Sequence, residues 1–140
     1  MMMKRFVYLL AVATMAVAQK ASADDCKSPK VKVVNDRTES IKVTKIQYFD
    51  GCDNVWRTEN VPETEIRGAQ GGTHYWAEFT DNLEYVGGSC AIPKFKVYRA
   101  IRKQTGKAYG PYQWGSDLAP DEGTQQVCNT NVRYTIHAHE

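Results

Sequence analysis

The chain has 140 residues, with 18 basic and 16 acidic side chains and a formal net charge of +2. A chain of this length corresponds to one domain that can bury a modest core. Proteins that bind nucleic acids carry a clear excess of lysine and arginine on one face, so this near-balance of charge argues against a nucleic-acid partner.

Residues 1–23 have the three parts of a secretory signal peptide. A positively charged start precedes an apolar run from Phe6 to Val17, and residues 21–23, Ala-Ser-Ala, form a small-x-small cleavage pattern. The apolar run is shorter than the roughly 20 residues needed to span a bilayer, so we expect cleavage rather than anchoring. The mature chain, residues 24–140, is then expected to be a single domain that is secreted or periplasmic and does not insert in a membrane. Cleavage leaves 15 basic against 16 acidic residues.

The mature chain is predicted to form a series of short strands, and the stretch from Ser40 to Asp50 gives the strongest signal. It is rich in β-branched and aromatic residues and runs into an Asp-Gly turn pair. Under strict alternation both faces carry apolar residues, with Ile41, Val43 and Phe49 on one side and Thr44, Ile46 and Tyr48 on the other. A strand that is apolar on both faces is typical of the interior of a sandwich.

Other strands are predicted on both sides of this one. A short strand over Val31–Val34 precedes it, and Asn35–Glu39 forms a polar turn between them. The remaining strands are expected at Val55–Val61, which Pro62 ends, and at Thr64–Arg67, Thr73–Thr80, Leu83–Val86, Ile92–Lys103 and Asn131–His139. Seven or eight short strands without a convincing helical period predict an all-β fold. We expect a small antiparallel β-sandwich, Ig-like or related.

Four cysteines lie in the exported part: Cys26, Cys52, Cys90 and Cys128. An even count in an oxidising compartment predicts two disulfides, and the wide spacing argues against a zinc or redox site. Three connectivities are possible. If Val31–Val34 and Ser40–Asp50 form a hairpin that turns near Asp36, Cys26 and Cys52 meet at its open end. This arrangement favours Cys26–Cys52 together with Cys90–Cys128.

Residues suited to catalysis are few. The sequence has no Gly-x-Ser-x-Gly motif, and its candidate bases near neutral pH are His74, His137 and His139. His137 and His139 lie two residues apart on the last strand, so their side chains project to the same side roughly 6.5–7 Å apart. With His74 or Glu140 as a third ligand they could bind a metal ion, but a solvated chain end is the simpler interpretation. We expect no enzyme activity, no metal and no cofactor.

An aromatic loop near the C-terminus is the strongest candidate for a binding site. Tyr109, Tyr112 and Trp114 stand among glycine and proline residues, and Tyr75 and Trp76 could extend the same surface. Exposed aromatic rings can anchor a protein partner or stack on a sugar. Alternatively, the loop folds back and its rings plug the open end of the sandwich.

Together these patterns predict a non-enzymatic, exported binding module. The expected partner is a protein, as for an inhibitor or an immunity protein, because a rigid disulfide-bonded surface loses little entropy on docking. A carbohydrate-binding module is the first alternative. A metal-binding protein or enzyme that uses the C-terminal histidines is the second.

Overall fold

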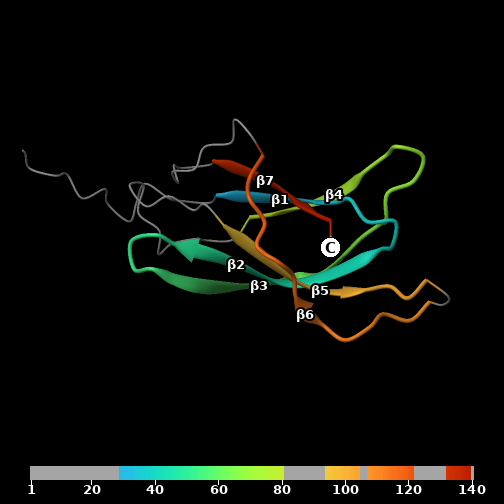
Figure 1. Ribbon diagram of the computed structural model, residues 1–140, viewed down its shortest axis with the longest axis horizontal. Coiled ribbons are helices and arrows are strands. Elements are labelled where there is room, and N and C mark those ends of the chain that lie inside the picture. Colours follow the sequence, from blue (N-terminus) through green and yellow to red (C-terminus); the bar gives the residue numbers. More distant parts are fainter. Residues whose placement is uncertain (1–28, 81–93, 105–106, 122–131, 140) are drawn as a thin grey trace, which may run out of the picture.

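The computed structural model describes residues 29–80, 94–104, 107–121 and 132–139 (Figure 1). In these ranges the chain forms seven strands: β1 (Lys30–Asn35), β2 (Ile41–Asp50), β3 (Val55–Ile66), β4 (Tyr75–Phe79), β5 (Phe95–Ile101), β6 (Gln113–Trp114) and β7 (Arg133–Ala138). The all-β prediction is therefore confirmed. The expected signal peptide and the strand expected at Leu83–Val86 lie outside the described residues. Within these ranges no helix is long and apolar enough to cross a membrane.

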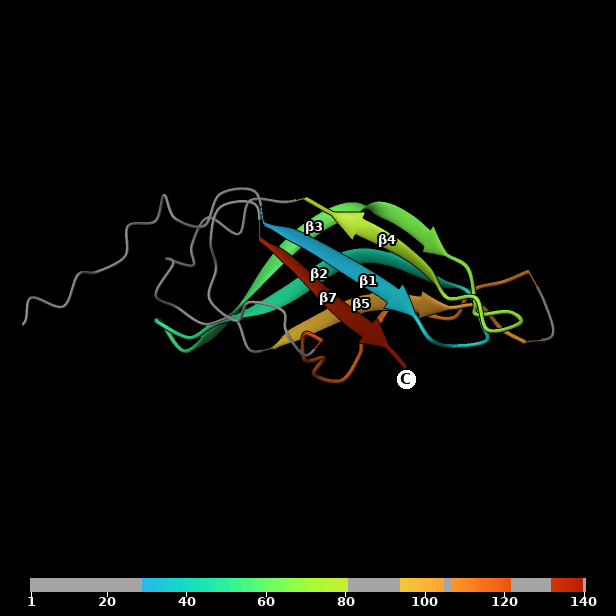
Figure 2. The same cartoon turned by 90° about the horizontal axis from the view of Figure 1, so that it is seen from above.

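The strands form two sheets, an arrangement compatible with a β-sandwich (Figures 1 and 2). One sheet has the order β4-β1-β7 and the other has the order β3-β2-β5-β6. All neighbouring strands are antiparallel except β1 and β7, which run in the same direction with Lys30 opposite Arg133. The prediction of an entirely antiparallel fold was wrong for this pair. A long stretch of sequence separates β1 from β7, so no tight hairpin forces them to run in opposite directions.

Apolar side chains from both sheets meet in one buried cluster. It contains 15 residues: Val31, Val33, Ile41, Val43, Ile46, Tyr48, Val61, Ile66, Phe79, Phe95, Val97, Leu118, Tyr134, Ile136 and Ala138. The rings of Phe95 on β5 and Tyr134 on β7 lie 5.3 Å apart and join the two sheets. Burying a large apolar side chain contributes about 1.5–3 kcal/mol, so this cluster holds the sheets together.

Strand β2 contains a β-bulge that the sequence pattern did not reveal. Its pairing with both β3 and β5 shifts register between Val43 and Lys45. The shift moves the alternation by one position, so Ile41 before it and Ile46 after it are both buried on the core side. Phe49 lies on the outer side instead. Strict alternation was therefore the wrong assumption for this strand, because it requires an unbroken ladder.

Strand β3 is longer than predicted. It runs for 12 residues, through Pro62 to Ile66, and joins the two strands expected at Val55–Val61 and Thr64–Arg67. Proline is tolerated here because β3 is an edge strand, and Pro62 lies in the interval where the β2–β3 register shifts. The prediction that Pro62 ends the strand was wrong.

The predicted β1–β2 hairpin does not form, because the two strands belong to different sheets. Asn35 fixes the crossing between them and is fully buried. Its Nδ2 donates to the backbone carbonyls of Glu39 at 2.9 Å, Ile66 at 3.2 Å and Arg67 at 3.0 Å. Its Oδ1 accepts a hydrogen bond from the Arg37 N–H at 3.0 Å. One side chain thus ties the end of β1 to the segment that follows β3.

Because the β1–β2 hairpin does not form, the predicted disulfide pairing loses the geometric argument that favoured it. Cys26–Cys52 was favoured because both residues would lie at the open end of that hairpin. Cys52 lies in the β2–β3 turn, whereas Cys26, Cys90 and Cys128 lie outside the described residues. Two disulfides therefore remain a prediction.

The β2–β3 turn is organised by Asp50, which is fully buried. Its carboxylate accepts hydrogen bonds from the N–H groups of Cys52 at 2.9 Å and Asp53 at 3.2 Å, and from Arg57 Nε at 2.8 Å. Burial alone would raise the pKa of Asp50, but these donors outweigh it and hold the pKa below its ordinary value. Asn54 adopts a left-handed φ of 57°, as asparagine readily does in turns.

Candidate functional site

The outer side of the β3-β2-β5-β6 sheet carries aromatic rings with lysines beside them. We call this surface the aromatic face. Its rings belong to Phe49, Trp56, Tyr98, Tyr109, Tyr112 and Trp114, and its cations belong to Lys42, Lys45, Lys94 and Lys96. All six rings are partly buried. The face thus spans four strands and the segment between β5 and β6.

Tyr98 is the centre of the larger ring group. It pairs with Trp114 across β5 and β6, where the two ring centroids lie 4.8 Å apart. The Tyr112 ring stacks on Tyr98 with a centroid distance of 5.6 Å. At the other end, Phe49 and Trp56 meet edge to face at 5.4 Å. Trp114 is absent from the buried cluster of the described residues, so the aromatic loop packs on the outside of the sheet.

Each lysine of the aromatic face lies over one ring. The ammonium groups are 4.3–5.6 Å from the ring centroids, in the pairs Lys42–Tyr109, Lys45–Tyr98, Lys94–Phe49 and Lys96–Trp56. Such cation–π contacts contribute about 0.5–1 kcal/mol at exposed sites. They also place positive charge directly over the rings.

Carboxylates fix one end of the aromatic face. Glu63 accepts hydrogen bonds from Lys42 at 2.9 Å and from the Tyr112 hydroxyl at 2.8 Å, and these contacts lower the pKa of Glu63. Burial and the Glu65 carboxylate raise the pKa of Tyr109 to about 12. The aromatic loop is therefore held to strand β3 by polar contacts.

The structure divides the predicted binding residues between the two sheets. Tyr109, Tyr112 and Trp114 belong to the aromatic face. Tyr75 and Trp76 lie on β4, in the other sheet. The Tyr75 ring packs against the core, whereas Trp76 is 55% exposed with the Lys32 ammonium 4.5 Å above its ring. These two residues are therefore not part of the same surface.

The sequence prediction did not include Phe49, Trp56 or Tyr98 in the binding site. Tyr98 alternates with buried Val97, and this position next to a core residue was a signal that it faces outward. No such signal existed for Phe49, because the β2 bulge places it on the outer side.

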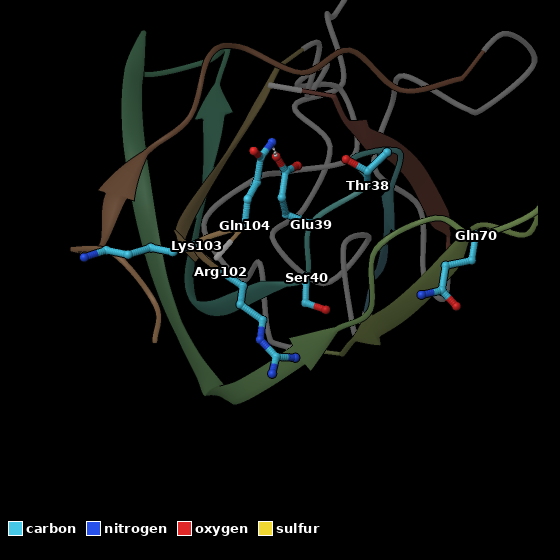
Figure 3. Close-up of a pocket in the computed structure, with 7 residues that line it drawn as sticks. All are labelled: Thr38, Glu39, Ser40, Gln70, Arg102, Lys103 and Gln104. Atoms are coloured by element: carbon cyan, nitrogen blue, oxygen red, sulfur yellow. Dashed lines mark hydrogen bonds between the residues drawn. The ribbon is translucent and has the colours of Figure 1, made fainter. Parts of the chain in front are cut away.

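A polar pocket of about 510 Å³ opens where β2 begins and β5 ends (Figure 3). It is lined by Thr38, Glu39, Ser40, Gln70, Arg102, Lys103 and Gln104. Gln104 Nε2 donates to Glu39 Oε1 at 3.2 Å, and the Arg102 N–H donates to the Ser40 carbonyl at 2.9 Å. Two cationic side chains, Arg102 and Lys103, and one carboxylate, Glu39, line this pocket, and Glu39 is also paired with Arg37.

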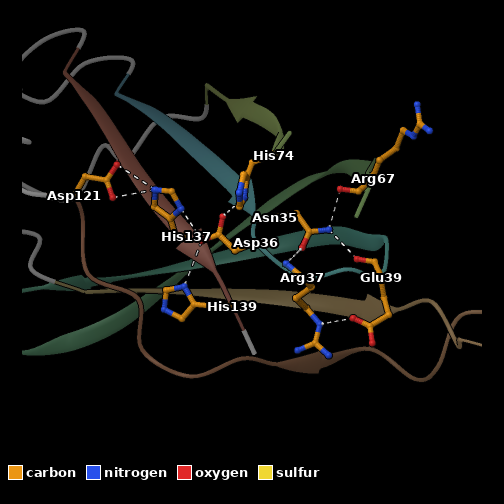
Figure 4. Close-up of polar contacts among 9 residues, drawn as sticks. All are labelled: Asn35, Asp36, Arg37, Glu39, Arg67, His74, Asp121, His137 and His139. Carbon is orange, nitrogen blue, oxygen red and sulfur yellow. Dashed lines mark hydrogen bonds and ion pairs between the residues drawn. The ribbon is translucent and has the colours of Figure 1, made fainter. Parts of the chain in front are cut away.

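All three histidines of the chain gather around Asp36 (Figure 4). His74 Nδ1 lies 2.7 Å from one carboxylate oxygen, and His137 Nδ1 lies 2.7 Å from the other. His139 Nδ1 is 3.6 Å from the latter oxygen. His137 Nε2 lies 3.1 Å from the Asp121 carboxylate. We call these five residues the histidine cluster.

The geometry of the histidine cluster bears on the metal site that the sequence suggested as an alternative. The structure brings His74 to the C-terminal pair, as that alternative required. However, the imidazoles contact two different oxygens of Asp36 instead of converging on one point. Among the residues that the structure describes, no group of three or more His, Cys, Asp or Glu is arranged to hold a metal ion.

In this cluster the pKa values of Asp36 and His137 are shifted in opposite directions. Burial alone would raise the pKa of Asp36, but hydrogen bonds from His137 and His74 hold it below 3.8. Burial alone would lower the pKa of His137, but Asp36 and Asp121 raise it above 6.5. Opposite charges in contact favour the charged form of each partner.

Comparison with known proteins adds no assignment, since no protein-family model, curated protein or solved structure matches this chain.

Proposed function

We propose that the chain is a non-enzymatic, exported binding module that recognises a protein partner through the aromatic face. The observation that carries this proposal is the packing of Tyr112 and Trp114 on Tyr98, outside the buried core. Rings that are partly exposed and already held in place can anchor a partner without a large loss of conformational entropy. Export rests on the signal-peptide pattern of residues 1–23.

The lysines favour a protein over a sugar as the ligand. A sugar stacks on the open face of an aromatic ring. Here the ammonium groups of Lys42, Lys45 and Lys96 already lie over three of the rings, so a sugar would have to displace them. A protein can instead place its own carboxylates beside these cations and its apolar side chains beside the rings.

Replacing Trp114 by alanine is expected to weaken partner binding by about 2 kcal/mol or more, roughly thirtyfold in Kd. The free energy of unfolding should fall by only about 1 kcal/mol, because the ring loses its contact with Tyr98 and leaves no cavity in the core. Trp76→Ala, an exposed tryptophan on the other sheet, is the matched control. A partner captured from envelope and culture fluid would be titrated calorimetrically against all three proteins, each melted in parallel.

Three outcomes contradict this proposal. A loss of about 3–5 kcal/mol of stability in Trp114→Ala would mean that the ring fills the core. Equal affinities of the three proteins would place the partner on another surface. Quenching of tryptophan fluorescence by soluble oligosaccharides, present in the wild type and absent in Trp114→Ala, would favour the carbohydrate-binding alternative.

We also propose an Ig-like sandwich in which each disulfide links neighbouring strands of one sheet. The division of seven strands into sheets of three and four supports the Ig-like arrangement, although the β1–β7 pair is parallel. Cys26 precedes Lys30 by four positions and Cys128 precedes Arg133 by five, and these two strand starts lie side by side. We therefore propose Cys26–Cys128 in place of the Cys26–Cys52 pair that the expected hairpin favoured.

The same reasoning pairs Cys52 with Cys90. The Phe49 N–H donates to the Lys94 carbonyl at 3.1 Å, so the end of β2 lies beside the start of β5. Cys52 follows Phe49 by three positions and Cys90 precedes Lys94 by four. A Cys26–Cys52 bond would instead have to connect the start of β1 in one sheet with the β2–β3 turn of the other sheet.

Peptide mapping of the unreduced mature protein by mass spectrometry should recover two linked pairs, Cys26–Cys128 and Cys52–Cys90. Their loops would stabilise the fold by about 4–5 and about 3–4 kcal/mol in the chain-entropy model. Reduction should therefore lower the melting temperature by well over 10 °C. Recovery of a Cys26–Cys52 peptide, or alkylation of free thiols under native conditions, would rule out this pairing.

A further inference from the structure

His137 occupies a position that suits its protonated form. Its Nδ1 lies 2.7 Å from Asp36 Oδ2, and its Nε2 lies 3.1 Å and 3.2 Å from the two oxygens of Asp121. A neutral imidazole carries one N–H and therefore donates to one of these carboxylates only. The other nitrogen then points its lone pair at a negative oxygen. Both contacts are favourable only when the ring is an imidazolium.

The histidine cluster joins parts of the chain that are far apart in sequence (Figure 4). Asp36 follows β1, His74 precedes β4, His137 lies near the end of β7, and His139 directly follows that strand. Backbone hydrogen bonds run beside it, from the Asp36 N–H to the Ala138 carbonyl at 3.0 Å and from the Asp121 N–H to the Thr135 carbonyl at 2.9 Å. Strand β7 lies at the edge of its sheet, with β1 on one side and a short antiparallel bridge between Pro120 and Ile136 on the other, and the cluster adds side-chain contacts at its end.

We propose that the histidine cluster is a proton-dependent latch, which holds the end of β7 on the β1–β2 crossing at mildly acidic pH and loosens it as the pH rises. This inference is independent of the partner-binding proposal. It needs no ligand and concerns only the chain's own side chains.

Other charged groups on the packed segments already have partners. They are Arg37 with Glu39 at 3.4 Å, Arg67 over the Tyr75 ring at 5.0 Å, Asp117 with Lys96 at 3.5 Å, and Arg133 with Glu78 at 2.9 Å. Among the described residues, the charge of the latch is therefore set by two carboxylates and three imidazoles. Of the three imidazoles, His137 is the one that lies within hydrogen-bond distance of both carboxylates.

The direction in which the stability of the latch changes with pH follows from the raised pKa of His137 and the lowered pKa of Asp36. The folded-state pKa of His137 is raised, so its contribution is complete below about pH 6.5 and is lost as the pH rises through that pKa. The folded-state pKa of Asp36 is lowered, so its contribution is present above about pH 3.8 and is lost as the pH falls through that pKa. The latch is therefore strongest between about pH 4 and pH 6.5.

Titration of the mature protein by NMR tests the latch directly, because three histidines give three ring signals. The His137 signal should titrate above pH 6.5, and Asp121→Asn should lower its midpoint. The melting temperature should fall by about 4 °C between pH 6 and pH 8. The protection factors for amide exchange at Ile136 and Ala138, which correct for the intrinsic rise of the exchange rate with pH, should fall over the same range.

Three variants distinguish the effect of the histidine cluster on the melting temperature from that of simply removing one surface charge. Asp36→Asn and Asp121→Asn should each remove most of the pH dependence of the melt, whereas Asp117→Asn, an exposed acid paired with Lys96, should retain it. The latch would be refuted by a His137 midpoint that is the same in wild type and Asp121→Asn. A stoichiometric metal ion that is lost in His137→Gln would also overturn it, in favour of a metal site.

Discussion

Replacing Asn35 by alanine is expected to lower the free energy of unfolding by about 3 kcal/mol or more. The substitution removes four hydrogen bonds from a fully buried site and leaves the carbonyls of Glu39, Ile66 and Arg67 and the N–H of Arg37 without this partner. A buried polar group left unsatisfied costs about 1–3 kcal/mol. Urea unfolding of the purified domain should show this as a lower midpoint with an unchanged slope.

Two further variants test the reason for the Asn35 effect. Asn60→Ala removes the same side chain from an exposed position on β3, and its stability should stay within about 0.5 kcal/mol of wild type. Asn35→Asp keeps the shape but replaces the donor with an oxygen that faces three carbonyls, so it should be at least as destabilising as alanine. A mild effect of both Asn35 variants would show that the crossing is held by packing alone.

Gly68→Ala is expected to destabilise the domain by about 2–3 kcal/mol. An alanine Cβ at this position would lie 2.0 Å from the Thr38 carbonyl oxygen and 2.9 Å from the Glu39 carbonyl carbon. These are backbone atoms of the β1–β2 crossing and cannot rotate away. The Ala69 N–H donates to the Arg37 carbonyl at 2.7 Å beside this contact, so the two segments would have to separate.

Gly110→Ala is the matched control for Gly68→Ala. Its Cβ would meet the Ile101 carbonyl oxygen at 3.7 Å, an ordinary contact, so the melting temperature should stay the same or rise slightly. Thermal melts of Gly68→Ala, Gly110→Ala and the wild type give the three melting temperatures to be compared. Equal melting temperatures would mean that the crossing can move away from residue 68 at little cost.

Strands could be predicted from the sequence where apolar and polar residues alternate without interruption. Strand β7 alternates apolar and polar residues without interruption, and its predicted inward residues Tyr134, Ile136 and Ala138 are buried. The faces of β2 were not predictable, because the bulge after Val43 shows only in the pairing with two other strands. The sheet assignment of β1 also failed, because the strands that pair with it, β4 and β7, are distant in sequence.

In the candidate sites, too, residues that are close to each other in sequence were predicted, whereas their contact partners on distant segments were not. Tyr112 and Trp114 were found because they are close in sequence and stand among turn-forming residues. Tyr98, on which both pack, lies on another strand and was not included. Likewise His137 and His139 were recognised from their spacing, but Asp36 is 101 residues from His137 and carried no signal.

The parallel alignment of β1 and β7 affects how the domain would respond to mechanical load. Because both strands run in the same direction, the start of β1 and the end of β7 lie at opposite ends of the pair. Tension applied between Lys30 and Ala138 would therefore slide one strand along the other. The hydrogen bonds of six residue pairs, from Lys30–Arg133 to Asn35–Ala138, would carry that load together instead of opening one after another. Tension applied across an antiparallel hairpin such as β2–β3 would instead unzip it from its open end.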